Sequence, residues 1–123
     1  MIGHVGLNVS KLQEYRDFLR AALEPLGYSL VHEDAEALIA GFANRDGSSV
    51  WLTEREPATS AAHLAFHAET TDAVDSFHKA AVAGGALDNG APGLRTYTPH
   101  YYAAYVLDAS GNNIEAVCEA FGD

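Results

Sequence analysis

Cysteine is almost absent from this sequence: Cys118 is its single cysteine among 123 residues. One cysteine excludes an internal disulfide and favours a reducing compartment. No apolar run approaches the roughly 20 residues that a membrane-spanning helix needs. The N-terminal stretch also lacks the basic segment and small-residue cleavage site of a secretory signal. We therefore expect a cytoplasmic protein with no membrane partner.

Positive charge is scarce as well. Seven lysines and arginines stand against 17 aspartates and glutamates, which gives a formal net charge of −10. Binding to nucleic acid or to an anionic membrane requires clustered cations, and the sequence has no basic run. Hydrophobic residues make up 48% of the chain and charged residues 20%, as in ordinary globular domains. The composition predicts a folded domain with no nucleic-acid partner.

The sequence contains an internal repeat. An offset of 59 positions places the hexamer HVGLNV at 4–9 on HLAFHA at 63–68, and it also aligns Phe18 with Phe77. A strand-like hexamer and a helix-like segment that match in one register indicate duplication. We expect a single domain over residues 1–123 with one module at about 1–56 and a second at about 62–119.

Each module is predicted to have the order βαβββ. Alternating apolar residues in both hexamers predict strands, and apolar residues at three- and four-residue spacing after them predict amphipathic helices. Ser10 and Gln13 have the spacing of a capping box at the first helix. The remaining strands are expected at 28–33, 37–42, 49–53, 86–88, 101–107 and 113–118, with a Gly/Pro-rich loop at 89–99. The predicted fold class is α+β, with two βαβββ modules whose mixed sheets form a cup.

Three polar side chains lie opposite the apolar faces of predicted strands. They are His4, His63 and Glu115. Two imidazoles and one carboxylate suit a divalent metal such as Fe, Mn, Zn or Ni, with positions left open for substrate. Solvated strand residues with no ligand remain the alternative. The equivalent histidines that open both modules favour the metal site.

Further candidates surround this set. Arg95 is the single cation of a long acidic stretch, and it would either bind an anionic substrate or anchor its own loop. Tyr101 and Tyr102 point to opposite faces of one strand, so at most one of them faces the site. His100 and Tyr101 are candidates for proton transfer, with Glu115 as a further catalytic group. The other candidates for contact with substrate are Tyr97, Trp51 and His67.

The repeat, its two opening hexamers and the segment NGAPGLRTYTPHYYAAYVLDASGNNIEAVC resemble the vicinal oxygen chelate superfamily. That superfamily includes glyoxalase I, fosfomycin-resistance proteins, extradiol dioxygenases and bleomycin-resistance proteins. The resemblance implies that His4, His63 and Glu115 bind the metal, and that the chain forms a homodimer with modules paired across subunits. Glyoxalase I has a fourth, acidic ligand whose place falls near Trp51 or Thr53 here, so the resemblance implies a three-ligand site.

The leading hypothesis is a metal-dependent enzyme of the glyoxalase/dioxygenase type. It would act on a small oxygen-bearing substrate bound to a divalent metal, as a lyase similar to lactoylglutathione lyase, an isomerase or an extradiol dioxygenase. The alternative is a non-catalytic protein that binds or sequesters a small molecule, as bleomycin-resistance proteins do. A third hypothesis is a structural or regulatory dimer. Nothing in the sequence selects the substrate or the reaction.

Overall fold

The computed structural model describes residues 2–119, which form two similar halves. The elements of the first half are β1 (His4–Val9), α1 (Leu12–Leu23), the 3-10 helix η1 (Glu24–Leu26), β2 (Ser29–Asp34), β3 (Ile39–Ala43) and β4 (Ser49–Glu54). Those of the second half are β5 (His63–His67), α2 (Thr71–Ala83), β6 (Leu87–Arg95), β7 (Tyr101–Leu107) and β8 (Asn113–Cys118). Each half thus has the predicted βαβββ order.

Two mixed sheets of four strands carry the same topology. The strand orders are β1-β4-β3-β2 in the first sheet and β5-β8-β7-β6 in the second. The first and last strand of each half pair in parallel, and the other pairs are antiparallel. This arrangement confirms the predicted α+β class and the duplication behind it.

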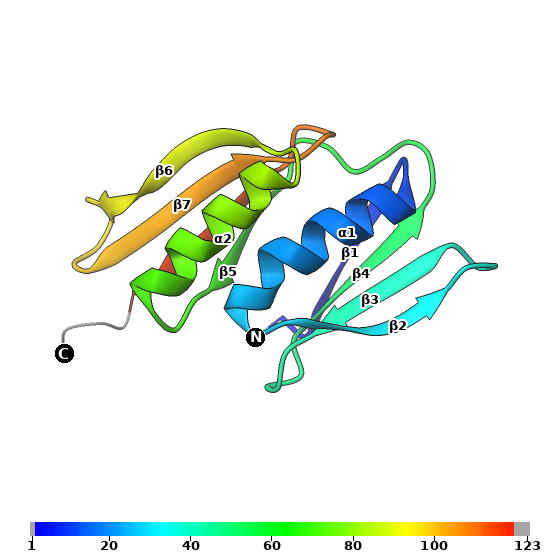
Figure 1. The fold of residues 1–123 in the computed structure, drawn as a ribbon, viewed down its shortest axis with the longest axis horizontal. Helices are drawn as coiled ribbons and strands as arrows, with labels where there is room; N and C mark the ends of the chain where they lie inside the picture. Colours follow the sequence, from blue (N-terminus) through cyan, green and yellow to red (C-terminus); the bar gives the residue numbers. More distant parts are fainter. Residues whose placement is uncertain (1, 120–123) are drawn as a thin grey trace.

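The helices pack against each other in the middle of the molecule, with one sheet on either side (Figure 1). Leu19 and Leu23 of α1 are buried together with Phe42 of β3, and Phe77 of α2 is buried together with Ile114 of β8. Each such side chain contributes about 1.5–3 kcal/mol through its removal from water. The helices therefore cover one face of each sheet. Within residues 2–119, neither helix has the length and apolarity that crossing a bilayer demands.

The start of α1 differs from the prediction. The N-cap residue is Lys11, and no side chain of the helix itself caps it. Instead the backbone N–H of Leu12 donates to Glu54 Oε1 at 2.9 Å. The predicted capping box at Ser10 is wrong, because a carboxylate at the end of β4 accepts from the first backbone N–H of this helix. By contrast, Thr70 caps α2 through a bond from the backbone N–H of Ala73.

The predicted loop at 89–99 is also corrected. Most of it is the edge strand β6, which pairs with β7 through two shifts of register around Gly90. Glycine and proline read as a loop in the sequence, yet both are tolerated on an edge strand with bulges. The neighbouring strand β7 supplies the pairing partner, which sequence reasoning did not detect.

A buried polar network joins α1 to the second half. Tyr15 donates its hydroxyl hydrogen to Asp108 Oδ2 at 2.6 Å, and Asn112 Nδ2 donates to the same oxygen at 2.8 Å. Asn112 also accepts from the backbone N–H of Ala62 and donates to the carbonyl of Thr59, both in the connection between the halves. The network fixes the segment from which β5 starts.

Candidate functional site

A buried carboxylate lies at the centre of the second sheet, on the face opposite α2. Glu115 of β8 is 1% exposed, and its Oε1 lies 2.7 Å from His63 Nε2 of β5. The hydroxyl of Tyr101 on β7 donates to the other oxygen, Oε2. Because β8 lies between β5 and β7, side chains of both neighbours reach one carboxylate.

Strand alternation explains why this acid is inside the protein. Ile114 and Ala116 join the apolar core, so Glu115 between them points to the opposite face. Its cross-strand neighbours are Ala65 and Tyr105. A buried charge requires hydrogen-bonding partners, and this carboxylate has one on each oxygen.

The tyrosines of this face are held in their protonated form. Burial, and then the hydrogen bond to Glu115, raise the pKa of Tyr101 well above its usual value. Burial, followed by the Tyr97 hydroxyl and the Glu115 charge, raises the pKa of Tyr105 to about 12, against an opposing effect of Arg95. Both phenols therefore act as hydrogen-bond donors at neutral pH, and neither acts as a base.

Arg95 lies over the same face at the end of β6. Its Nη2 donates to the carbonyl of Ala91 at 2.7 Å, and its guanidinium carbon lies 5.3 Å from the centre of the Tyr105 ring. Glycines make room for it, since a Cβ at Gly93 would lie 3.1 Å from Nη1 and a Cβ at Gly90 would lie 3.3 Å from Nη2. These two glycines of β6 thus leave room for one cation beside Tyr105.

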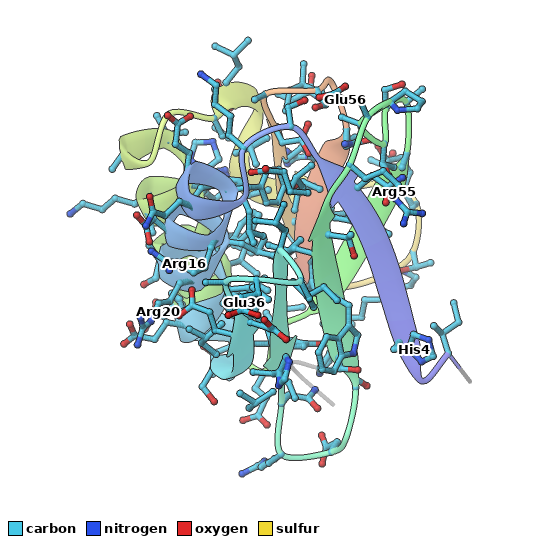
Figure 2. All side chains as sticks on the ribbon, turned by 90° about the vertical axis from the view of Figure 1, so that its right-hand side faces the viewer. His4, Arg16, Arg20, Glu36, Arg55 and Glu56 are labelled. Carbon is cyan, nitrogen blue, oxygen red and sulfur yellow. The ribbon has the colours of Figure 1, made fainter. Side chains whose placement is uncertain are left out.

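The third predicted ligand lies on the other sheet. Figure 2 shows His4 at the end of β1. It is paired in register with Ser49 of β4. His4, His63 and His67 line one cleft of about 810 Å³ between the halves. Within residues 2–119, no group of three histidine, cysteine or acidic side chains has the proximity that a metal ion requires. Within a single chain His63 contacts Glu115, and His4 lines the same cleft as His63 without joining the two in such a group.

The remaining candidates lie around these groups. The Tyr97 ring packs edge-on against that of Tyr101 at 5.1 Å between centroids. His100 is in the turn before β7 with φ of 67°, a left-handed conformation for which histidine is enriched. Trp51 lies on β4 of the first sheet. Tyr102 points away from Glu115 and donates to Asp75 Oδ1, as the predicted opposite faces require.

Tyr105 belongs to the site, although sequence reasoning did not single it out. It is four residues after Tyr101 on the same strand, so both rings lie on one face. That spacing was the available signal. The sequence offered no comparable signal that Gly90 and Gly93 leave the space in which the Arg95 guanidinium lies.

Two βαβββ halves with a histidine–carboxylate pair on one sheet define the class of this protein. The family model of the Glyoxalase/Bleomycin resistance protein/Dioxygenase superfamily matches residues 1–116. The chain belongs to this superfamily, as its sequence resemblance predicted.

Solved structures agree with the family assignment. A glyoxalase/bleomycin resistance protein from Albidiferax ferrireducens T118 matches with a TM-score of 0.82 and 28% identity, over 96% of this chain and 98% of that chain. The fosfomycin resistance protein FosX from Mesorhizobium loti matches with a TM-score of 0.71 and 16% identity, over 98% and 93%.

A mutant FosX from Listeria monocytogenes, complexed with Mn(II) and 1S,2S-dihydroxypropylphosphonic acid, matches with a TM-score of 0.71 and 17% identity, over 95% and 88%. The two FosX likenesses show a shared fold. A comparison with curated proteins found no match.

Proposed function

We propose that this protein is a metal-dependent enzyme that binds a small oxygen-bearing substrate at a divalent metal held by His63 and Glu115. The observation that carries this proposal is the 2.7 Å contact between a ring nitrogen of His63 and the buried carboxylate of Glu115. The Mn(II) complex of the FosX from Listeria monocytogenes supports a metal in this fold. A lyase, isomerase or dioxygenase reaction is compatible with this donor set.

The donor set fits such an ion. Two ligands at bond lengths of about 2.1 Å and a right angle lie about 3.0 Å apart, close to the present separation of the two atoms. The His63 side chain is 55% exposed, so its ring is free to adjust while Glu115 stays fixed by Tyr101. One imidazole and one carboxylate suit Mn, Fe, Zn or Ni.

His4 is the proposed third ligand. Because no third donor joins His63 and Glu115 within residues 2–119 of one chain, we propose that His4 comes from a second copy in a homodimer. β1 and β5 are edge strands, so each has a free side along which another chain fits. The site would then form only in the dimer.

The residues around this pair have separable roles in the proposal. Bound metal would supply a Lewis acid for two neighbouring substrate oxygens. Arg95 would bind an anionic part of the substrate, and the protonated Tyr101 and Tyr105 would donate hydrogen bonds to developing negative charge. Tyr97 and His67 remain proposed substrate contacts, and His100 remains a proposed proton-transfer group.

Metal analysis tests the proposal directly. Protein dialysed against Mn(II) should retain about one ion per chain, and His63→Ala and Glu115→Gln should each lose it. His78→Ala is the matched control, because His78 Nε2 contacts Asp88 Oδ1 at 2.9 Å in a similar histidine–carboxylate pair on α2 and β6. Equal Mn(II) content in the wild-type protein and all three variants would reject the site. Small-molecule binding that survives chelator treatment would favour the sequestering alternative.

A mixing experiment tests the origin of the third ligand. His4→Ala and His63→Ala chains, unfolded and refolded together, form mixed dimers with one intact site if His4 acts across subunits. Random pairing then restores about a quarter of the wild-type Mn(II) content, while each variant alone binds none. If the mixture also binds none, His4 is supplied within its own chain. If His4→Ala alone retains Mn(II), His4 is no ligand.

A further inference from the structure

The duplicated halves can be compared residue by residue through their strand register. In the second sheet, Glu115 lies between Ala65 of β5 and Tyr105 of β7. The corresponding row of the first sheet places Trp51 between Gly6 of β1 and Gly41 of β3. Trp51 is therefore the counterpart of Glu115. The register decides between the two positions, Trp51 and Thr53, that the sequence left open.

The Trp51 ring lies flat on the strand beside it. A Cβ at Gly41 would lie 2.5 Å from Cζ3 of the indole, so only glycine allows this position. The indole N–H donates to Ser49 Oγ at 3.1 Å, and the ring of His32 lies 5.6 Å away at an angle of 53°. Trp51 and His32 together form an aromatic platform on the face of the first sheet opposite α1.

The platform and His4 belong to one face. Ser49 is the register partner of His4, and Trp51 follows two residues later on the same side of β4. Any assembly that brings His4 to the pair of His63 and Glu115 therefore brings the indole with it. This holds whether His4 acts within its chain or across a dimer.

We infer that Trp51 is a specificity-determining residue of the metal site, where it forms an aromatic wall in place of a fourth ligand. The inference rests on the proposed function. A wall of two rings next to open metal positions selects substrates that carry a planar ring beside two neighbouring oxygens. Substrates with only a small aliphatic group beside those oxygens leave the indole without a partner.

Fluorescence tests the position of the wall, because Trp51 is the single tryptophan of the chain. Binding of Co(II), which quenches nearby indoles, should remove most of the emission, whereas Zn(II) at equal occupancy should not. Trp51→Glu should tighten Mn(II) binding about tenfold or more by adding a carboxylate ligand, and the uncharged Trp51→Gln should not. Full Co(II) occupancy with unchanged emission would overturn the inference.

Ligand binding tests the selectivity. With Mn(II)-loaded protein in a calorimeter, phenylglyoxylate should bind about tenfold more tightly than pyruvate, which offers the same two oxygens with a methyl group. Trp51→Ala should abolish this preference, Trp51→Phe should keep it, and Gly41→Ala should weaken it by displacing the indole. If Trp51→Ala is unfolded, the Trp51→Phe and Gly41→Ala results decide.

The two proposals fail separately. Equal binding of both acids by wild-type protein, or a preference unchanged in Gly41→Ala, overturns the aromatic wall and leaves the metal site intact. Absence of Mn(II) binding in wild-type protein overturns the proposed function itself.

Discussion

Two adjacent tyrosines of β7 provide an internal control for the role of the buried carboxylate. Tyr101 donates to Glu115, and Tyr102 donates to Asp75 on the other face of the sheet. Replacement of either by phenylalanine removes one hydroxyl and one tyrosine–carboxylate hydrogen bond. Tyr101→Phe should impair both stability and Mn(II) binding, whereas Tyr102→Phe should leave Mn(II) binding unchanged.

The expected magnitudes follow from burial. Glu115 is 1% exposed, so loss of the Tyr101 hydroxyl leaves a buried carboxylate oxygen without a donor, at a cost of about 1.5–3 kcal/mol. The Tyr102–Asp75 bond is exposed and should contribute less than about 1 kcal/mol. Loss of the hydroxyl that orients Glu115 should also weaken Mn(II) binding by about 10- to 100-fold.

Urea unfolding and Mn(II) calorimetry on both variants measure these two effects. Tyr101→Phe should lower the free energy of unfolding by at least about 0.5 kcal/mol more than Tyr102→Phe does. Equal Mn(II) affinity in the two variants would refute the conclusion that Tyr101 orients a metal ligand. An equal loss of unfolding free energy in the two variants would refute the argument that burial makes the Tyr101 hydrogen bond the stronger of the two.

Three further predictions concern the framework of the site. Glu54→Ala should lower the free energy of unfolding by about 0.5–2 kcal/mol in urea titrations, and Ser10→Ala should have no comparable effect, since Glu54 caps α1. Asn112→Ala should cost about 2–4 kcal/mol in the same assay, because Asp108, Thr59 and Ala62 each lose a partner; a cost below about 1 kcal/mol would contradict the role of the network. Burial, then Asp108, raise the pKa of Tyr15 in the folded protein, so its stabilising contribution is complete below about pH 10 and is lost above it. The free energy of unfolding should therefore fall above about pH 10 by about 1.4 kcal/mol per pH unit more in wild type than in Tyr15→Phe, and parallel curves would exclude this linkage.

Much of the fold was determined by the sequence alone. Alternation of apolar residues at His4–Val9 and at His63–His67 predicted both opening strands, and helical spacing predicted α1 and α2. These signals are local, because they depend only on which side of a strand or helix meets the core. The duplication followed from the same periodicities repeated at one offset.

The identity of some site residues was also present in the sequence. Strand alternation placed Glu115 and His63 opposite the apolar faces, and it separated Tyr101 from Tyr102. What alternation could not give is the distance between strands that are far apart in the chain. The contact of His63 with Glu115 depends on β5 pairing beside β8, since the two residues are 52 positions apart in the sequence.

Tertiary structure decided the remaining features for the same reason. Glu54 replaces Ser10 as the cap of α1 because β4 ends beside that helix, and β6 is a strand because β7 offers it an edge. Trp51 is assigned as the counterpart of Glu115 only by the pairing of β4 with β1 and β3. Sequence periodicity fixes the face on which a side chain lies, whereas pairing between distant strands fixes its neighbours, and the chemistry of this site depends on those neighbours.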